Sequence, residues 1–246
     1  CGRGGGLGGG PGGDVLKLSV VVPAFNEETT VAGVLRAHVD LMRRLVDEGE
    51  LLVCDDGSTD GTAAMIAAVA AEQPEVRVIR HERNLGIPAT MKRLYAEARG
   101  DWVYFTPADG QVPVGALERM WRAREGMALV VGGRVPRRDP FTRLLVAELY
   151  STVLRGIFRL PVKDIDSVKL YRGEDLRSLT VRSRSNFFEA ELLITLCRRR
   201  RPVTEVVVEH RPRIAGKPKG LTPSSAALAI RELSLFMLSD FVRGRR

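Results

Sequence analysis

The chain is poor in the residues that mark several common classes of protein. Its 246 residues include only three cysteines, Cys1, Cys54 and Cys197, and three histidines. Cysteines so few and so widely spaced predict neither a disulfide framework nor a zinc site, and they favour a reducing, cytoplasmic compartment. Aromatic residues make up 6% of the chain. This low share argues against a platform that stacks the bases of single-stranded nucleic acid.

Long apolar runs are also missing. No stretch approaches the roughly 20 apolar residues that a membrane-spanning helix needs, and the glycine-rich N-terminus lacks the apolar core of a signal peptide. Residues 1–13 hold nine glycines, a composition that predicts a flexible tail. The chain as a whole is 44% hydrophobic and 28% charged, which predicts a folded domain with a substantial core.

Basic residues outnumber acidic ones, with 38 Lys and Arg against 30 Asp and Glu and a net charge of +8. Much of the excess lies in residues 198–220, which contain eight Lys or Arg and two Glu. Such a segment favours an anionic partner. Nucleic acid, an anionic lipid surface and a phosphorylated substrate all fit this composition. Because a basic cluster usually faces phosphate groups or is merely solvated, we predict no nucleic-acid partner.

Short apolar runs rich in β-branched residues alternate with helical patterns. The runs predict strands over residues 16–22, 51–54, 76–81, 102–106 and 128–131, and the patterns between them predict helices over 27–48, 60–71, 86–98 and 114–125. Strands without polar alternation, joined by helices, are typical of a mostly parallel sheet that helices cover on both faces. The sequence therefore predicts an α/β fold.

Beyond Arg134 the alternation is looser. Helical patterns span residues 141–158, 187–197 and 224–242, and extended segments span 168–171 and 205–210. The last helix is amphipathic, with an apolar face made of Ala226, Ile230, Leu233, Met237 and Phe241. We divide the chain into the tail, a domain over residues 14–221 and this C-terminal helix over 222–246. The helix either lies in a membrane interface or packs on the domain or a second copy, and both interpretations stay open.

Polar residues gather where the predicted strands end. Four strands are followed by the segments Pro23–Glu28, Cys54–Thr62, Arg83–Gly86 and Pro107–Gln111, which are rich in carboxylates, amides and glycines. Each segment has an ordinary structural interpretation, such as a helix cap at Asp60 or a turn at Gly57. In an open parallel sheet, however, ligands bind beyond the carboxyl ends of the strands. Four such segments at one edge therefore indicate a site.

The residue types indicate what that site would hold. Asp56 is suited to accept a hydrogen bond from a nucleobase N–H group, and Glu27 from a hydroxyl. Asp109 and Gln111 offer hard oxygen ligands for Mg²⁺ or Mn²⁺ shared with phosphate oxygens, although Asp109 also fits a turn before Gly110. A glycine-rich dinucleotide fingerprint, a P-loop and a serine-hydrolase elbow do not occur in the sequence.

The motifs resemble those of the family 2 glycosyltransferases, which have the GT-A fold. The likeness rests on V-P-A-F-N-E (Val22–Glu27), D-D-G-S-T-D-G-T (Asp55–Thr62) and R-N-L-G (Arg83–Gly86). Later stretches are most similar to dolichol-phosphate mannosyltransferases and related polyprenyl-phosphate glycosyltransferases; they are Asp164–Arg172, Asn186–Leu193 and Arg213–Lys219. The resemblance implies transfer of a sugar, with inversion, from a GDP- or UDP-sugar to a lipid phosphate.

The resemblance also implies roles for single residues. Those expected at the nucleoside are Pro23, Phe25, Glu27, Cys54 and Asp56. Those expected at the metal and diphosphate are Ala108, Asp109 and Gln111. Arg134 is expected near the donor or acceptor phosphate. Arg213 and Lys219 are expected to bind the phosphates. Asp109, Arg213 and Lys219 are the expected catalytic residues, and Asp109 and Gln111 the expected ligands of Mg²⁺ or Mn²⁺.

The sequence departs from the family pattern in one informative place. The first carboxylate of the D-x-D motif is replaced by Pro107. This departure keeps open a catalytically impaired partner subunit that only binds a nucleotide sugar. A lipid phosphate acceptor needs no general base, whereas a soluble hydroxyl acceptor does. Glu189 and Glu191 are candidates for that base, although the charge preference of a helix N-terminus explains them equally well.

Overall fold

The computed structural model describes residues 16–137, 141–213 and 223–243. Within these residues, seven strands form one sheet in the order β3-β2-β1-β4-β6-β5-β7. The strands are β1 (Lys17–Ala24), β2 (Glu48–Asp55), β3 (Val76–Arg80), β4 (Trp102–Phe105), β5 (Leu129–Arg134), β6 (Lys169–Arg172) and β7 (Val203–Val208). All neighbouring pairs are parallel except those of β6, which runs antiparallel to both β4 and β5. The predicted mostly parallel α/β sheet is confirmed.

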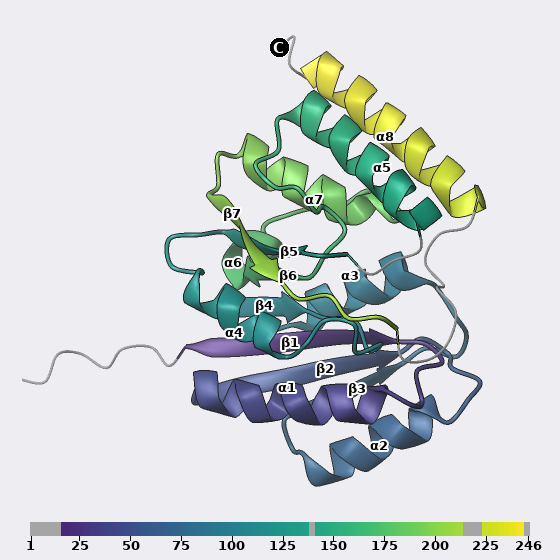
Figure 1. The fold of residues 1–246 in the computed structure, drawn as a ribbon, viewed down its shortest axis with the longest axis vertical. Helices are drawn as coiled ribbons and strands as arrows, with labels where there is room; N and C mark the ends of the chain where they lie inside the picture. Colours follow the sequence, from purple (N-terminus) through teal and green to yellow (C-terminus); the bar gives the residue numbers. More distant parts are fainter. Residues whose placement is uncertain (1–15, 138–140, 214–222, 244–246) are drawn as a thin grey trace, which may run out of the picture.

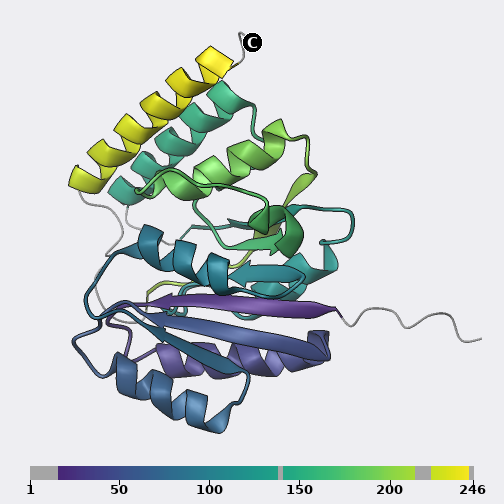
Figure 2. The same ribbon diagram turned by 180° about the vertical axis from the view of Figure 1, so that it is seen from behind.

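Helices cover both faces of the sheet, as Figures 1 and 2 show from opposite sides. One face carries α1 (Val31–Leu45), α2 (Thr62–Glu72) and α4 (Gly115–Arg122), and the other carries α3 (Ile87–Glu97), α5 (Phe141–Phe158), α7 (Phe187–Arg198) and α8 (Pro223–Arg243). The short helix α6 (Gly173–Arg177) was not predicted. Successive strand residues point to opposite faces. Val20 therefore packs under α1 while Val21 packs under α3, and both are fully buried.

The C-terminal helix α8 is part of this core. The ring of Phe236 lies 5.6 Å from that of Phe187 on α7 and 6.1 Å from that of Phe158 on α5. The carboxylate of Glu232 accepts hydrogen bonds from the backbone N–H groups of Arg184 (2.8 Å) and Ser185 (3.0 Å). The helix therefore packs on the domain, one of the two interpretations that the sequence left open.

The face that α8 buries differs from the predicted one. Ala229, Leu233 and Phe236 pack inward, whereas Ile230, expected on the packed face, is 66% exposed. α8 lies side by side with α5 (Figure 1). Both helices carry apolar side chains that are exposed to solvent, here called the apolar row, which include Leu145 and Leu149 on α5 and Leu235 and Leu238 on α8. Among the helices that the structure describes, none is long and apolar enough to cross a membrane.

A buried polar cluster ties the late strands to α3 and α7. The ammonium group of Lys169, which is fully buried, lies 3.1 Å from the carboxylate of Glu189. The hydroxyls of Tyr95 (2.8 Å) and Tyr171 (2.9 Å) donate to the same carboxylate. Burial, together with the negative charge of Glu189, raises the pKa of both tyrosines well above the usual range. The tyrosines therefore stay neutral and act as donors.

This cluster generates a stability prediction. Replacing Lys169 by Met leaves the Glu189 carboxylate buried without its cation, which is expected to lower the free energy of unfolding by about 3 kcal/mol. The matched control, Arg36→Met, breaks an exposed ion pair with Glu72 and is expected to cost less than about 1 kcal/mol. Urea denaturation measures both values. Equal losses in the two variants would contradict the role of the buried pair.

Candidate functional site

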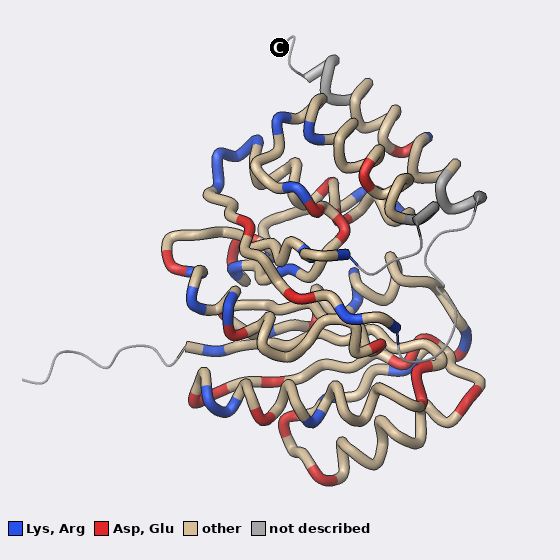
Figure 3. Tube along the Cα trace, viewed as in Figure 1, with Lys and Arg blue, Asp and Glu red and all other residues tan. Residues whose placement is uncertain are grey.

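One edge of the sheet collects the predicted site segments. The parallel strands β1, β2, β4 and β5 all end there, and the antiparallel strand β6 begins there (Figure 1). Pro23 and Cys54 are cross-strand neighbours, as are Ala24 and Asp55. Figure 3 shows acidic positions at this edge, next to the ends of β1 and β2. The strand-end segments from the sequence therefore do meet in space.

The first two motifs interlock through side chain to backbone hydrogen bonds. The backbone N–H of Asn26 donates to the hydroxyl of Ser58 (3.0 Å), and the N–H of Thr59 donates to the side-chain oxygen of Asn26 (2.8 Å). The N–H of Glu27 donates to the hydroxyl of Thr62 (2.7 Å). Asn26 has a left-handed φ of 52°, a conformation that asparagine tolerates better than most residues. These contacts hold the backbone on either side of Glu27 against the second motif.

The second and third motifs meet at Asp56. Its carboxylate accepts hydrogen bonds from the backbone N–H groups of Leu85 and Gly86, each at 2.9 Å. Gly57 lies so close to this loop that a Cβ on it would stand 2.5 Å from the backbone of Arg83, and its φ of +69° is also unfavourable for other residues. The conformation of the R-N-L-G segment is therefore fixed by its contacts with the D-D-G-S segment.

His81 is a residue of this site that the sequence reasoning missed. It directly follows β3, and its Nδ1 atom lies 2.7 Å from Oδ1 of Asp56. Its Nε2 atom lies 3.9 Å from the Sγ atom of Cys54. Burial is the main cause that raises the pKa of Cys54, to about 12, so this thiol stays protonated and is no nucleophile. The sequence did contain a signal for this residue. His81 is the last residue of the predicted third strand, and the predicted second strand leads into Asp55 and Asp56.

Arg213 connects the segment after β1 with the segment after β4. Its guanidinium lies 3.1 Å from Oε1 of Glu27 and 2.6 Å from Oδ2 of Asp109. The segment before it pairs with the loop after β4, because the N–H of Arg211 donates to the backbone oxygen of Gln111 (2.7 Å) and the side-chain amide of Gln111 donates to the oxygen of Arg211 (3.2 Å). Four of the predicted site residues thus form one cluster, in which Arg213 neutralises two acidic groups.

Arg134 lies at the same edge of the sheet, at the end of β5. Its guanidinium makes two hydrogen bonds to the Asp164 carboxylate, at 2.7 and 2.8 Å, and donates to the backbone oxygen of Asp166 at 2.9 Å. Burial acts to raise the pKa of Asp164, but the hydrogen bonds and charge of Arg134, with the charge of Arg137, outweigh it and lower the pKa. Arg134 therefore fixes the loop that leads into β6.

The remaining predicted residues differ in burial and in hydrogen-bond partners. Pro23 and Ala108 are buried, and Phe25 is half-buried at the end of β1. Lys219 and the glycine-rich tail lie outside the described residues. The two candidate bases are engaged elsewhere: Glu189 belongs to the buried polar cluster, and Glu191 accepts hydrogen bonds from the backbone of Arg182 and Ser183.

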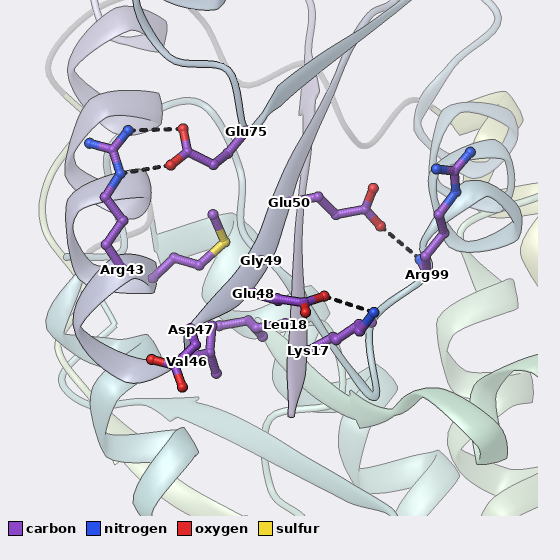
Figure 4. A pocket seen from close by; sticks show the side chains of 12 residues that line it. Lys17, Leu18, Arg43, Val46, Asp47, Glu48, Gly49, Glu50, Glu75 and Arg99 are labelled. Carbon is purple, nitrogen blue, oxygen red and sulfur yellow. Dashed lines mark hydrogen bonds and ion pairs between the residues drawn. The ribbon is translucent and has the colours of Figure 1, made fainter. Parts of the chain in front are cut away.

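A pocket in the surface, drawn in Figure 4, lies at the opposite edge of the sheet, where β1 and β2 begin. Several of its charged residues are paired. Lys17 pairs with Glu48 at 2.7 Å, Arg43 pairs with Glu75 at 2.7 Å, and Glu50 accepts a hydrogen bond from the backbone of Arg99. None of the predicted strand-end residues lines this pocket, so the strand-end cluster remains the candidate site.

The donor set fits a divalent cation that is bound together with phosphate. Within the described residues, no group of three or more His, Cys, Asp or Glu side chains could hold a metal by itself. Mg²⁺, however, is commonly held by one or two carboxylates, with phosphate oxygens and water completing its shell. Asp109 supplies one carboxylate, whose Oδ1 atom accepts the N–H of Gln111 at 3.0 Å. Pro107 stands where a second carboxylate would be.

Comparison with known proteins places this site in context. An undecaprenyl-phosphate 4-deoxy-4-formamido-L-arabinose transferase of Serratia proteamaculans is 30% identical over 210 residues, which is 83% of this chain and 63% of that protein. A dolichyl-phosphate beta-glucosyltransferase of Trichomonas vaginalis is 26% identical over 216 residues, which is 79% of this chain and 64% of that protein. The chain thus spans less than two-thirds of the length of these relatives.

The fold is shared with solved glycosyltransferases, and a family model matches the sequence. A glucosyl-3-phosphoglycerate synthase from Mycobacterium tuberculosis, in complex with Mn²⁺, uridine diphosphate and phosphoglyceric acid, is similar with a TM-score of 0.68 and 25% identity, covering 92% of this chain and 78% of that one. The model of the family Glycosyl transferase family 2 matches residues 19–177, more than half of the chain. The resemblance in the motifs is therefore confirmed, and the chain belongs to glycosyl transferase family 2.

Proposed function

We propose that this chain is an inverting glycosyltransferase that moves a sugar from a GDP- or UDP-sugar to a polyprenyl phosphate. The observation that carries the proposal is the bridge that Arg213 makes between Glu27 and Asp109, which follow two different strands. Asp56, after a third strand, belongs to the motif that hydrogen-bonds the backbone of Glu27. Relatives named for undecaprenyl-phosphate and dolichyl-phosphate transfer support the acceptor, and a solved relative with uridine diphosphate supports a nucleotide-sugar donor.

In this proposal, different residues bind the nucleoside and the diphosphate of the donor. Asp56 accepts a hydrogen bond from the nucleobase, and Glu27 accepts one from a ribose hydroxyl. Arg213 exchanges its carboxylate partners for the diphosphate, whose oxygens suit the fork of a guanidinium. Asp109 and Gln111 would hold Mg²⁺ or Mn²⁺, which neutralises charge on the departing diphosphate when bound. The acceptor oxygen attacks the anomeric carbon from the face opposite the diphosphate.

The metal assignment gives the first test of function. Asp109→Asn is expected to reduce release of nucleoside diphosphate at least 100-fold and to abolish its dependence on Mn²⁺, because the amide loses the charged ligand. Asp101→Asn, an exposed carboxylate at the opposite edge of the sheet, serves as the matched control and should retain the wild-type rate. Undiminished turnover of wild type in excess EDTA would contradict a metal role. Donor binding without any turnover would identify a partner subunit instead.

We further propose that the apolar row on α5 and α8 rests on the cytoplasmic face of a membrane, where a polyprenyl phosphate is available. Exposed apolar patches of this kind commonly mark contact surfaces. Leu235 and Leu238 are 53% and 63% exposed, and Lys and Arg near a bilayer surface contribute about 1 kcal/mol each toward anionic lipid. The excess of basic residues in the chain suits that surface.

Vesicle flotation tests this contact. The double variant Leu235→Ser, Leu238→Ser is expected to bind vesicles containing anionic lipid at least tenfold more weakly, because two leucine side chains no longer enter the interface. The control Met65→Ser, Val78→Ser removes exposed apolar side chains from the distant half of the domain and should bind as wild type does. Equal binding by wild type and both variants would exclude α8 as the contact.

One observation favours a second acceptor class, a soluble hydroxyl. Asp166 is exposed in the loop before β6, and its carboxylate accepts no hydrogen bond from any residue that the structure describes. Although the residue reaches solvent, the surrounding protein desolvates its carboxylate, and this raises its pKa against the opposing charge of Lys169. The charges of Asp164 and Glu189 also raise the pKa of Asp166, and the charge of Arg134 lowers it. Burial, together with the charge of Asp166, in turn raises the pKa of the nearby phenol of Tyr150. A carboxylate in this setting suits a general base.

The pH dependence of transfer separates the two acceptor classes. A base must be deprotonated, so transfer to phosphoglyceric acid through its hydroxyl is expected to rise with pH through the raised pKa of Asp166. Asp166→Asn should remove that limb and cost 100-fold or more. Transfer to farnesyl phosphate, which carries its own oxyanion, should change little. Asp40→Asn, on an exposed helix face, is the control. An unchanged profile in Asp166→Asn with both acceptors would exclude Asp166 as the base.

A further inference from the structure

The hydrogen bonds around Asp56 define what its carboxylate is still able to accept. Asp56 is 3% exposed, and two donors reach its Oδ1 atom: Nδ1 of His81 at 2.7 Å and the N–H of Leu85 at 2.9 Å. One donor, the N–H of Gly86, reaches Oδ2 at 2.9 Å. A carboxylate has about four acceptor positions, two on each oxygen. The protein therefore occupies Oδ1 and leaves a single position on Oδ2.

The role of Nδ1 of His81 follows from its neighbour. A carboxylate only accepts hydrogen bonds, so Nδ1, which faces Asp56, carries a proton and donates it to Oδ1. On the other side of the ring, Nε2 lies 3.9 Å from the thiol of Cys54, a weak donor. Burial keeps that thiol protonated. The contact between His81 and Asp56 thus has its donor on the histidine and its acceptor on the carboxylate.

The single remaining acceptor position distinguishes between nucleobases. Uracil and thymine present one ring N–H group between two carbonyl oxygens. Guanine presents a ring N–H and an adjacent amino group, a pair of donors that matches both oxygens of one carboxylate. With Oδ1 occupied, the second guanine donor has no partner at Asp56, and an unsatisfied buried donor is costly. Cytosine has an unprotonated ring nitrogen at the position of the uracil N–H, and this atom repels a carboxylate.

We propose that Asp56 selects a nucleoside diphosphate sugar with a uracil-type base, and that His81 is the positioning residue that sets this selection by occupying Oδ1. The inference rests on the proposed function, because it assumes that the strand-end cluster holds a nucleotide sugar. It narrows the donor from any nucleotide sugar to a uridine or thymidine diphosphate sugar. His81 acts through Asp56 and does not touch the base.

Calorimetric titration of the full chain with four nucleotides tests the choice of base. In the presence of Mn²⁺, UDP and dTDP are expected to bind within tenfold of each other, and GDP and CDP 10- to 100-fold more weakly than UDP. CDP is the matched probe, since it shares the ribose and diphosphate of UDP. GDP binding as tightly as UDP would overturn the selection of a uracil-type base, and CDP binding as tightly would overturn the contact between Asp56 and the ring N–H.

Two variants test the role of His81. His81→Leu frees one of the two acceptor positions on Oδ1 for the second guanine donor, so the preference for UDP over GDP is expected to fall at least tenfold. His81→Asn, whose amide nitrogen stands near the place of Nδ1, should restore most of the preference. A merely structural role would weaken all nucleotides alike and leave their ratio unchanged, and that result would overturn the proposal for His81. If His81→Leu does not fold, His81→Phe, which keeps a ring but also removes the donor, replaces it and is expected to give the same loss of preference.

The binding experiments distinguish a failure of this inference from a failure of the proposed function. A wild-type protein that prefers GDP would overturn this inference but remain a nucleotide-sugar glycosyltransferase. A protein that binds none of the four nucleotides would overturn both. Selective binding of UDP and dTDP without sugar transfer would support the inference and count against the activity.

Discussion

The carboxylates that lie together at one edge of the sheet each need a hydrogen-bond donor or a cation, and several long-range contacts of this structure provide one. Burying an unpaired carboxylate is costly, because it loses its hydration without compensation. Arg213 bridges Glu27 and Asp109, and His81 with two backbone amides holds Asp56. Segments that are distant in the sequence are thereby brought together, and the acidic groups that would recognise a ligand are held in place before it binds.

The same requirement organises the later half of the domain, with a different outcome. There the acidic groups are paired permanently: Asp164 with Arg134, and Glu189 with Lys169 and two tyrosines. These contacts fix the loop before β6 and the packing of α7. Asp166 is the exception among the carboxylates of this loop, since no described side chain neutralises it through a hydrogen bond. In this half of the domain, the acidic residues that have a permanent protein partner are thus the ones with structural roles.

Two regions of the molecule therefore respond differently to a ligand. Arg213 is held by ion pairs that a diphosphate is able to replace, because the guanidinium fork fits phosphate as well as carboxylate. The buried pair of Lys169 and Glu189 has no such substitute. Rearrangement on binding is accordingly expected at the segment that leads to Arg213, while the sheet and the helices on its two faces stay fixed.

The sequence by itself determined the element order, because apolar runs and helical periods follow from local burial, and it determined which residues stand at the strand ends. Motif resemblance then indicated the family. The tertiary structure alone decided the antiparallel direction of β6, the face of α8 that is buried and the partner of each carboxylate. Those features depend on contacts between residues such as Asp56 and His81, or Asp109 and Arg213, which lie far apart in the chain. No local pattern encodes such pairings, because each forms only when the whole sheet has assembled.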